Sequence, residues 1–230
     1  MNSVYRCGLV AATLLLALPA VSAELETDEQ KLGYLIGMDI GGSLKTNDTP
    51  VDIDALLEAI RTVYEGGTPA MTEEEAKAVR EAFMAKRQAA ATAEQAQVAT
   101  ANKAQGDAFL ATNAKAEGVQ VTASGLQYKV VTEGTGAKPK ATDTVTVHYR
   151  GTLLDGSEFD SSYSRGEPIS IPLNQVIPGW TEGVPLMSVG SKYTFWIKPE
   201  LGYGAQGGGR IPPQSTLVFD VELIGIEGAQ

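Results

Sequence analysis

The C-terminal half of the chain sets aromatic and β-branched residues beside few polar ones, and it carries most of the chemical information in the sequence. The motifs are residues 145–151 (VTVHYRG), 158–161 (EFDS), 176–180 (VIPGW), 202–204 (GYG) and 217–223 (LVFDVEL). Asp160 is the carboxylate that we assign to these side chains, since Asp220 and Glu222 alternate with apolar residues as the solvated face of a strand, and no nucleophile stands beside a base. These residue types favour a pocket that grips an apolar substrate over a site that makes or breaks covalent bonds.

The scarcity of histidine and cysteine excludes several classes of enzyme. The chain has one of each. A single histidine rules out multi-histidine metal sites, and any Ser–His–Asp triad would have to use His148. Because His148 alternates with Val147 and Tyr149 in a strand-like run, we interpret it as a structural residue. The sequence therefore predicts neither a metal-dependent nor a hydrolytic enzyme.

The first residues are typical of a secretory signal peptide. Arg6 precedes an apolar run at 8–18 (GLVAATLLLAL), and small residues at 21–23 predict cleavage before Glu24. The run is shorter than the roughly 20 residues that a membrane span needs, although a retained anchor is the alternative. Cys7 lies inside this segment and away from a lipoprotein position. The mature chain would thus have no thiol for a disulfide, a nucleophile or a metal site, which suits an oxidising compartment.

The charge balance excludes nucleic acid as a partner. The chain has 18 basic and 28 acidic residues, a net charge of −10. Loss of residues 1–23 removes one cation, Arg6, and no anion, so the net charge becomes −11. Such a chain repels phosphate backbones, and no basic stripe offsets the repulsion.

The composition changes near Gly118, and residues 24–117 have a helical pattern. Thr27 and Gln30 form a capping-box signature before apolar residues at helical spacing. Gly33, Gly37 and Gly41 fall on one face of this helix. Each glycine costs up to about 1 kcal/mol inside a helix, so the spacing predicts close approach of another backbone; the alternative is a merely weakened surface helix.

Two further helices follow. The second starts at Asp52 or Asp54, and Gly66 and Gly67 end it. The two short helices have too thin a core to stand alone, which predicts pairing with a second copy. A capping box at Thr72 opens the third, alanine-rich stretch to residue 117. As one helix it would extend roughly 65–70 Å as a solvated stalk; a flexible linker is the alternative.

Residues after 118 alternate β-forming residues with turns. One short helix, with Pro178 in its first turn and residues 180–187 as its body, interrupts them. The predicted strands are 126–132, 144–151, 157–160, 169–171, 192–198 and 216–226. The predicted fold is therefore α+β: an N-terminal helical region with a long stalk, then a twisted antiparallel sheet wrapped on one short helix.

The C-terminal motifs carry a family resemblance. The order VHYRG, DG, EFDSS, VIPGW, EGV, MSVG, GYG, IPP and TLVFDVEL resembles an FKBP-type peptidyl-prolyl cis/trans isomerase over the whole C-terminal region. The helices before it are similar in layout to the secreted, dimeric macrophage-infectivity-potentiator type. The implied domains are a signal peptide (1–23), a helical dimerisation region (24–71), a stalk helix (72–117) and the isomerase domain (118–230).

The resemblance also implies a site and its chemistry, with no cofactor. An X–Pro amide can isomerise without a covalent intermediate in an apolar trough with a few oriented polar atoms. Trp180 would form the floor, and the Asp160 carboxylate and Tyr203 hydroxyl the polar handles. The Ile177 N–H would bind a substrate carbonyl. The implied catalytic residues are Tyr149, Phe159, Asp160, Trp180, Tyr203 and Phe219, and the implied substrate-binding residues are Ile169, Val176, Ile177 and Ile211.

Two positions depart from the family pattern. Ile169 stands where many relatives have an aromatic wall, so this side of the pocket is expected to be shallower. Residues 206–210 (QGGGR) form a glycine-rich loop before Ile211, which puts the substrate-capping role of this segment in doubt. Both changes bear on the sequence preference around proline and on the affinity for macrolide inhibitors, which are candidate ligands.

The sequence thus predicts a periplasmic or secreted isomerase, including an outer-membrane-associated one, that assists the folding of exported proteins. Its substrates would be unfolded or partly folded proteins with X–Pro bonds, held between two sites of a homodimer joined through the N-terminal helices. The alternative is a peptide-holding chaperone or surface-interaction module in which isomerisation is incidental.

Overall fold

The computed structural model describes residues 25–228, and the chain divides into two compact units between Ala76 and Lys77. The predicted signal peptide, with Cys7, lies outside the described residues. Within residues 25–228, no helix combines the length and apolar character that crossing a bilayer requires.

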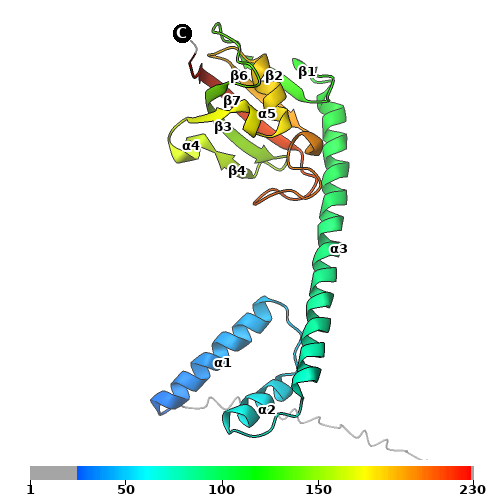
Figure 1. Ribbon diagram of the computed structural model, residues 1–230, viewed down its shortest axis with the longest axis vertical. Helices are drawn as coiled ribbons and strands as arrows, with labels where there is room; N and C mark the ends of the chain where they lie inside the picture. The colour runs from blue at the N-terminus through cyan, green and yellow to red at the C-terminus, as the bar shows by residue number, and fades with distance from the viewer. Residues whose placement is uncertain (1–24, 229–230) are drawn as a thin grey trace, which may run out of the picture. The chain divides into compact units, whose positions relative to one another are not determined.

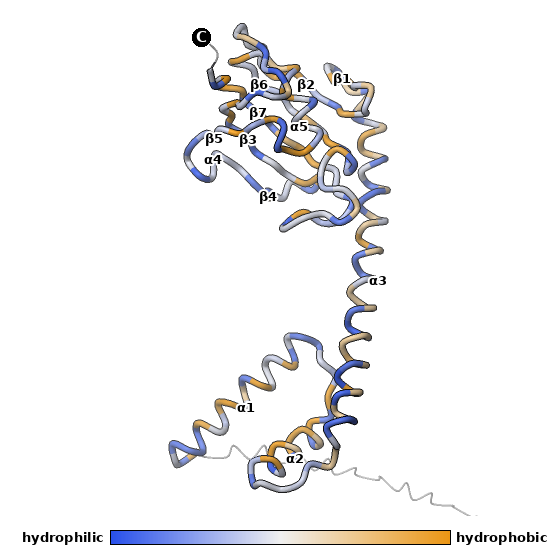
Figure 2. Tube along the Cα trace, in the orientation of Figure 1, coloured by the Kyte–Doolittle hydropathy of each residue, from blue (hydrophilic) through white to orange (hydrophobic). Residues whose placement is uncertain are grey.

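The first unit consists of two helices, α1 (Asp28–Thr46) and α2 (Ile53–Tyr64) (Figure 1). The capping box predicted at Thr27 is present: the Thr27 side chain accepts a hydrogen bond from the Gln30 N–H, and Gln30 Oε1 accepts one from the Thr27 N–H. Asp52 caps α2 through a 3.0 Å bond from the Ala55 N–H. Neither helix has a buried residue, and apolar positions recur along both (Figure 2).

Helix α3 (Glu73–Asn113) is one continuous helix of 41 residues, which confirms the predicted stalk and not the flexible linker. The second predicted capping box begins it: Thr72 Oγ1 accepts from the Glu75 N–H at 3.2 Å, and Glu75 Oε2 accepts from the Thr72 N–H at 2.9 Å. At 1.5 Å per residue, α3 is about 60 Å long. Its one buried residue is Gly106.

The second unit is built on an antiparallel sheet. Its strands run in the order β1-β2-β6-β7-β3-β4, with β5 also paired to β3. The strands are β1 (Val119–Val121), β2 (Gln127–Thr132), β3 (Thr144–Leu153), β4 (Glu158–Ser161), β5 (Ile169–Pro172), β6 (Lys192–Ile197) and β7 (Leu217–Ile226). The long central strands β3 and β7 alternate buried and less buried residues, as a sheet with one face on a core requires.

Helix α5 (Pro178–Gly183) covers the buried face of this sheet (Figure 1). Two glycines allow its close approach to β6. A Cβ atom on Gly179 would fall 2.7 Å from Ile197, and one on Gly183 would fall 2.7 Å from Phe195. The core beneath α5 includes Trp180, Val184 and these two β6 side chains. The fold is therefore α+β, as predicted.

The remaining elements are short. Helix α4 (Ser162–Arg165) follows β4, and single 3-10 turns occupy Leu173–Gln175 (η1), Val184–Leu186 (η2) and Pro199–Leu201 (η3). The sequence did not predict β1 or α4. His148 lies on β3 and has structural contacts: its Nδ1 is 2.9 Å from Ser162 Oγ, and its ring stacks on Tyr163.

Candidate functional site

A cavity of about 470 Å³ opens on the face of the sheet that α5 covers. It is lined by Tyr149, Phe159, Asp160, Ile169, Ile171, Gln175, Val176, Ile177, Trp180, Tyr203 and Phe219. The structure thus brings together nine of the ten site residues that the resemblance implied. Ile211 is not in the lining; it is buried, with 7% of its surface exposed, in the core beside the cavity.

Trp180 and three other aromatic rings make the apolar part of the cavity. Trp180 is 4% exposed. The Tyr149 and Phe219 rings each lie 5.2 Å from the Trp180 ring, with interplanar angles of 89° and 83°. Phe159 meets Phe219 in the same perpendicular manner, at 5.4 Å. Aromatic rings favour these edge-to-face arrangements, so the four rings support one another as a fixed apolar surface.

The strands place these rings. Tyr149 on β3 and Phe219 on β7 both point to the covered face of the sheet, where both are buried. Gly151, two residues after Tyr149, leaves the space that the other rings fill. A Cβ atom on Gly151 would fall 2.7 Å from the Phe159 ring and 2.8 Å from Phe219. Gly151 is therefore required by the aromatic wall in front of it.

Asp160 is the carboxylate of the cavity, and two side chains donate hydrogen bonds to it. The Tyr149 hydroxyl donates to Oδ2, and Arg165 Nη1 donates to Oδ1 at 2.5 Å. Arg165 Nη2 also donates to the Tyr149 hydroxyl oxygen at 2.8 Å. Together, Tyr149, Asp160 and Arg165 form a closed hydrogen-bonded triangle at the rim of the cavity.

Arg165 is a site residue that the sequence analysis missed. It lies in α4, which Ser161 caps by accepting a 3.3 Å bond from the Ser164 N–H, and which ends at Gly166 with φ of +83°. This single helical turn brings Arg165 back to Asp160. A serine cap followed by a glycine five residues later is a local signal for such a turn, and it could have placed Arg165 beside Asp160.

The hydrogen bonds set the protonation of the triangle. Burial acts to raise the pKa of Asp160, but the bonds from Tyr149 and Arg165 outweigh it and hold the pKa below its ordinary value of 3.8. Burial, with the bond to Asp160, raises the pKa of Tyr149 above its ordinary value of 10.0. At neutral pH the carboxylate is therefore ionised and the phenol is protonated.

The segment before α5 supplies backbone groups. Ile177 lies at the N-terminus of the helix, and its carbonyl accepts from the Trp180 N–H at 2.9 Å. Within residues 25–228, the Ile177 N–H donates to no other atom of the protein. Trp180 Nε1 is likewise a buried donor with no partner in the described chain. Because Ile177 lines the cavity, its N–H is the unused donor that a substrate carbonyl could reach, whereas Trp180 Nε1 is buried.

The walls hold two residues that the sequence analysis did not name, Ile171 and Gln175. Ile171 follows Ile169 by two residues on β5, so strand periodicity places both on one face. Tyr203 also lines the cavity, although 44% of its surface is exposed. A Cβ atom on Gly208 would fall 3.2 Å from the Tyr203 ring, so the glycine-rich loop packs against it.

These groups suit non-covalent chemistry. The cavity offers aromatic surface, an ionised carboxylate in fixed geometry and the unused Ile177 N–H. Asp160 already accepts from two donors, and His148 is absent from the lining. No nucleophile stands beside a base among the lining residues. The arrangement can desolvate a peptide and hold its carbonyl groups, which is what twisting an amide requires.

Comparison with known proteins identifies the family. The family model for FKBP-type peptidyl-prolyl cis-trans isomerases matches residues 135–224, and the model for the domain amino-terminal to such isomerases matches residues 29–130. The FKBP-type peptidyl-prolyl cis-trans isomerase FkpA of Aeromonas hydrophila is 47% identical over 215 residues, or 90% of this chain and 80% of the relative. The outer membrane protein MIP of Legionella longbeachae is 42% identical over 96% of this chain and 95% of its own.

A solved structure agrees with these relatives. The crystal structure of FkpA from Escherichia coli superimposes with a TM-score of 0.75 at 39% identity, and the match covers 88% of this chain and 98% of that one. Both the helical N-terminal region and the sheet domain fall within these matches. The chain therefore belongs to the family of FKBP-type peptidyl-prolyl cis/trans isomerases and carries, before the isomerase domain, the amino-terminal domain that accompanies such isomerases.

Proposed function

We propose that the aromatic cavity around Trp180 is the place where this isomerase binds an X–Pro segment and turns its amide bond. The observation that carries this proposal is the juxtaposition of a buried apolar floor with fixed polar groups: Trp180 beneath, the Asp160 carboxylate at the rim, and the unused Ile177 N–H beside them. A proline ring fits the apolar floor, and the flanking carbonyls have donors within the same cavity.

The mechanism follows from what limits the reaction. Rotation about an X–Pro amide crosses a barrier of about 18–20 kcal/mol, because the twisted state loses C–N resonance. Water stabilises the planar, polar ground state, so transfer of the amide to an apolar cavity lowers the barrier. A donor such as the Ile177 N–H holds the neighbouring carbonyl while the amide turns. Selective binding of the twisted form then provides the acceleration.

The charged triangle positions the cavity wall. Arg165 lies over the Tyr149 ring, with its guanidinium carbon 5.5 Å from the ring centroid, and both side chains bond to Asp160. This arrangement fixes the Tyr149 ring against Trp180. The Asp160 carboxylate, paired with Arg165, is in this way held as a fixed polar group at the rim of the cavity.

The natural substrates would be proteins that fold outside the cytoplasm. The support is the signal-peptide pattern of residues 1–23 and the name of one relative, an outer membrane protein. Cleavage before Glu24 would release the mature chain into the periplasm. Macrolides are candidate inhibitors, because they would fill an apolar proline-binding cavity. The side of the cavity that Ile169 lines has no aromatic residue at that position.

The helices α1 and α2 would join two copies of the chain. Although neither helix buries a residue, Leu35 and Ile36 of α1 are each 51% exposed, and Leu57 and Val63 of α2 are 56% and 61% exposed. Nothing lies within 4 Å of a Cβ atom placed on Gly33, Gly37 or Gly41. A helical unit with this much apolar surface and an open glycine face fits pairing with a second copy.

The alternative function, a peptide-holding chaperone with incidental isomerisation, would use the helical unit more than the cavity. The complete aromatic floor and the hydrogen-bonded Asp160 favour the enzyme, since a holding surface needs neither. Titration of the ¹⁵N-labelled chain with a short X–Pro peptide tests the binding site. We expect the Trp180 indole and Ile177 amide signals to shift with the proline peptide and to stay in place with its alanine counterpart. Shifts confined to α1 and α2 would contradict the proposed site.

A further inference from the structure

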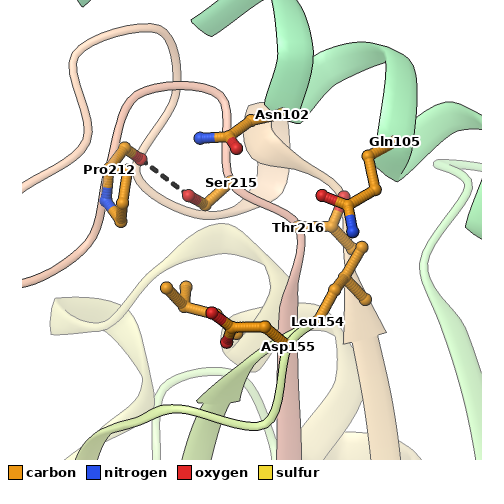
Figure 3. Close-up of a pocket in the computed structure, with 8 residues that line it drawn as sticks. Asn102, Gln105, Leu154, Asp155, Pro212, Ser215 and Thr216 are labelled. Atoms are coloured by element: carbon orange, nitrogen blue, oxygen red, sulfur yellow. Dashed lines mark hydrogen bonds between the residues drawn. The ribbon is translucent and has the colours of Figure 1, made fainter. Parts of the chain in front are cut away.

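The last turns of α3 pack against the segment that carries Tyr203, and a small cavity of about 130 Å³ lies at this junction (Figure 3). We call residues 202–216, between η3 and β7, the Tyr203 loop. Asn102 and Gln105 reach the junction from α3, and Pro212, Ser215 and Thr216 reach it from the loop. The Tyr203 loop therefore has two faces, one on the aromatic cavity and one on α3.

Gly106 is the closest point of this contact. A Cβ atom on Gly106 would fall 2.3 Å from Thr216 Oγ1. Thr216 is 3% exposed, and its hydroxyl oxygen has no hydrogen-bond partner in the described chain. Gly106 is also the only glycine between residues 68 and 117. An alanine there would favour the helix by about 1 kcal/mol. The glycine at this position therefore serves the close contact with Thr216 and not the stability of the helix.

Asn102 lies one turn before Gly106 and holds the loop by a hydrogen bond. Its Nδ2 donates to the Pro213 carbonyl at 2.8 Å. The N–H of the same peptide group, from Gln214, donates to the Gly204 carbonyl at 3.1 Å. One peptide group thus connects α3 to the residue next to Tyr203.

The loop conformation at this point needs support from its surroundings. Gln214 has φ of +56°, a left-handed conformation that costs a non-glycine residue on the order of 1 kcal/mol. Ser215 Oγ donates to the Pro212 carbonyl at 2.8 Å (Figure 3). The bonds from Asn102 and to Gly204 both hold the peptide group that precedes Gln214, so they fix the base of the loop in its unusual backbone path.

We propose that Asn102 and Gly106 are positioning residues of the isomerase: α3 fixes the Tyr203 loop and thereby the Tyr203 side chain in the substrate cavity. The helix then supports the isomerase site through the Tyr203 loop, although none of its residues lines the cavity. This inference rests on the proposed function, because it assumes that the cavity lined by Tyr203 is the isomerisation site.

A second attachment keeps α3 in place when the first is altered. Gln127 of β2 donates to the Leu110 carbonyl at 2.8 Å and accepts from Asn113 Nδ2 at 2.9 Å. Loss of the Asn102 bond would consequently free the loop without releasing the helix. Variants at Asn102 and Gly106 can therefore be studied in the full chain that begins at Glu24.

The experiment compares Asn102→Ala, Gly106→Ala, Thr216→Ala and the double variant Gly106→Ala/Thr216→Ala with the parent. Gln97→Ala removes a polar side chain from an exposed position of the same helix and serves as the control. Two quantities are measured: kcat/KM for an X–Pro peptide, and the amide signals of Gly204, Gly207, Gly208 and Gly209, which report the loop position whether or not the protein is active.

We expect Asn102→Ala to lower kcat/KM about two- to tenfold, the effect of one lost hydrogen bond, and to shift the loop amides. Gly106→Ala should do the same, because its methyl group displaces Thr216. The double variant should recover the parent's kcat/KM and signals, since Thr216→Ala removes the clashing hydroxyl. A merely structural role would lower stability without this recovery of activity.

Three results would overturn the inference. The loop signals of Asn102→Ala and Gly106→Ala could coincide with those of the parent; they could shift while kcat/KM stays unchanged; or Gln97→Ala could lose as much activity as they do. An inactive parent would contradict the proposed isomerisation site instead. The loop signals would in that case still show whether α3 positions the loop.

Discussion

The rings of Tyr149 and Trp180 stand perpendicular to each other, 5.2 Å apart, while the hydroxyl of the same tyrosine donates to Asp160. One side chain therefore ties the apolar floor of the cavity to its carboxylate. Because Arg165 donates to both Tyr149 and Asp160, the position of the floor depends on a polar network at the rim. A change in this network should affect catalysis even where no apolar surface is lost.

Removal of the Tyr149 hydroxyl tests this dependence. Tyr149→Phe keeps the ring against Trp180 but leaves Asp160 with Arg165 as its donor. We expect kcat/KM for an X–Pro peptide to fall about three- to tenfold, the effect of one hydrogen bond to a partly solvated carboxylate. Tyr163→Phe is the matched control, since its hydroxyl bonds to Glu222 on another part of the sheet. Equal losses in both variants would contradict a specific role for Tyr149.

The pH dependence follows from the two altered pKa values. The pKa of Asp160 lies below 3.8 and that of Tyr149 above 10.0, so neither group titrates in the middle of the pH range. We expect kcat/KM to be constant from about pH 5 to 9, since neither group changes its charge there. A steep change of kcat/KM between pH 5 and 9 would contradict this account of the two groups.

The lowered pKa of Asp160 also determines how the free energy of unfolding changes with pH. A depressed carboxyl pKa stabilises the fold at pH values above the ordinary 3.8, and this stabilisation is lost as the pH falls through the folded-state value. The unfolding free energy of the parent should thus exceed that of Asp160→Asn at neutral pH. This gap should narrow in acid, and a gap that widens below pH 3.8 would contradict the assignment. Because the Asp160 side chain is 44% exposed, solvent screening will keep the gap small.

Gly151 should be intolerant of a side chain. Gly151→Ala would push a methyl group into the Phe159 and Phe219 rings, and such overpacking typically costs about 1–3 kcal/mol. We expect lower stability in denaturant unfolding together with reduced kcat/KM. Gly225→Ala is the control on β7, because nothing lies within 4 Å of its added Cβ atom. A Gly151→Ala protein as stable and as active as the parent would show that the aromatic wall can move freely.

The proposed pairing through α1 and α2 can be tested with one charge. Leu57→Glu places a carboxylate on the exposed apolar face of α2, where burial against a second copy would be costly. Sedimentation at micromolar concentration should show a dimer for the parent and a monomer for this variant. Val98→Glu, on an exposed position of α3, should remain a dimer. A parent protein that sediments as a monomer would contradict the proposed dimer.

Much of the fold could be predicted because its signals are local. Thr27 and Thr72 each begin a helix through a capping box. The ends of the predicted strands lie within two residues of the observed ends. The strand β1 escaped prediction because its three residues have no periodicity of their own, and its pairing with β2 defines it.

The site was predictable to the extent that motifs carry it. The aromatic residues stand in motifs of fixed order, so the resemblance supplied them together. Arg165 was missed because its role depends on the short α4 turn between Ser161 and Gly166, which strand periodicity does not reveal. Ile171 was missed because only Ile169 lay at a position with a family pattern. The packing of Gly106 on Thr216 joins residues far apart in the sequence, and no local pattern could have indicated its partner.

The most direct test of the account is the isomerisation rate of a short X–Pro peptide, measured with a coupled protease on the chain beginning at Glu24. Trp180→Leu and Asp160→Ala are compared with the parent, after circular dichroism has shown that both are folded. Trp196→Leu is the control, since the other tryptophan of the chain lies on β6 and outside the cavity lining. We predict strong activity in the parent and the control, and large losses in the two cavity variants. Full activity in folded Trp180→Leu and Asp160→Ala proteins would contradict the assignment of this cavity as the isomerisation site.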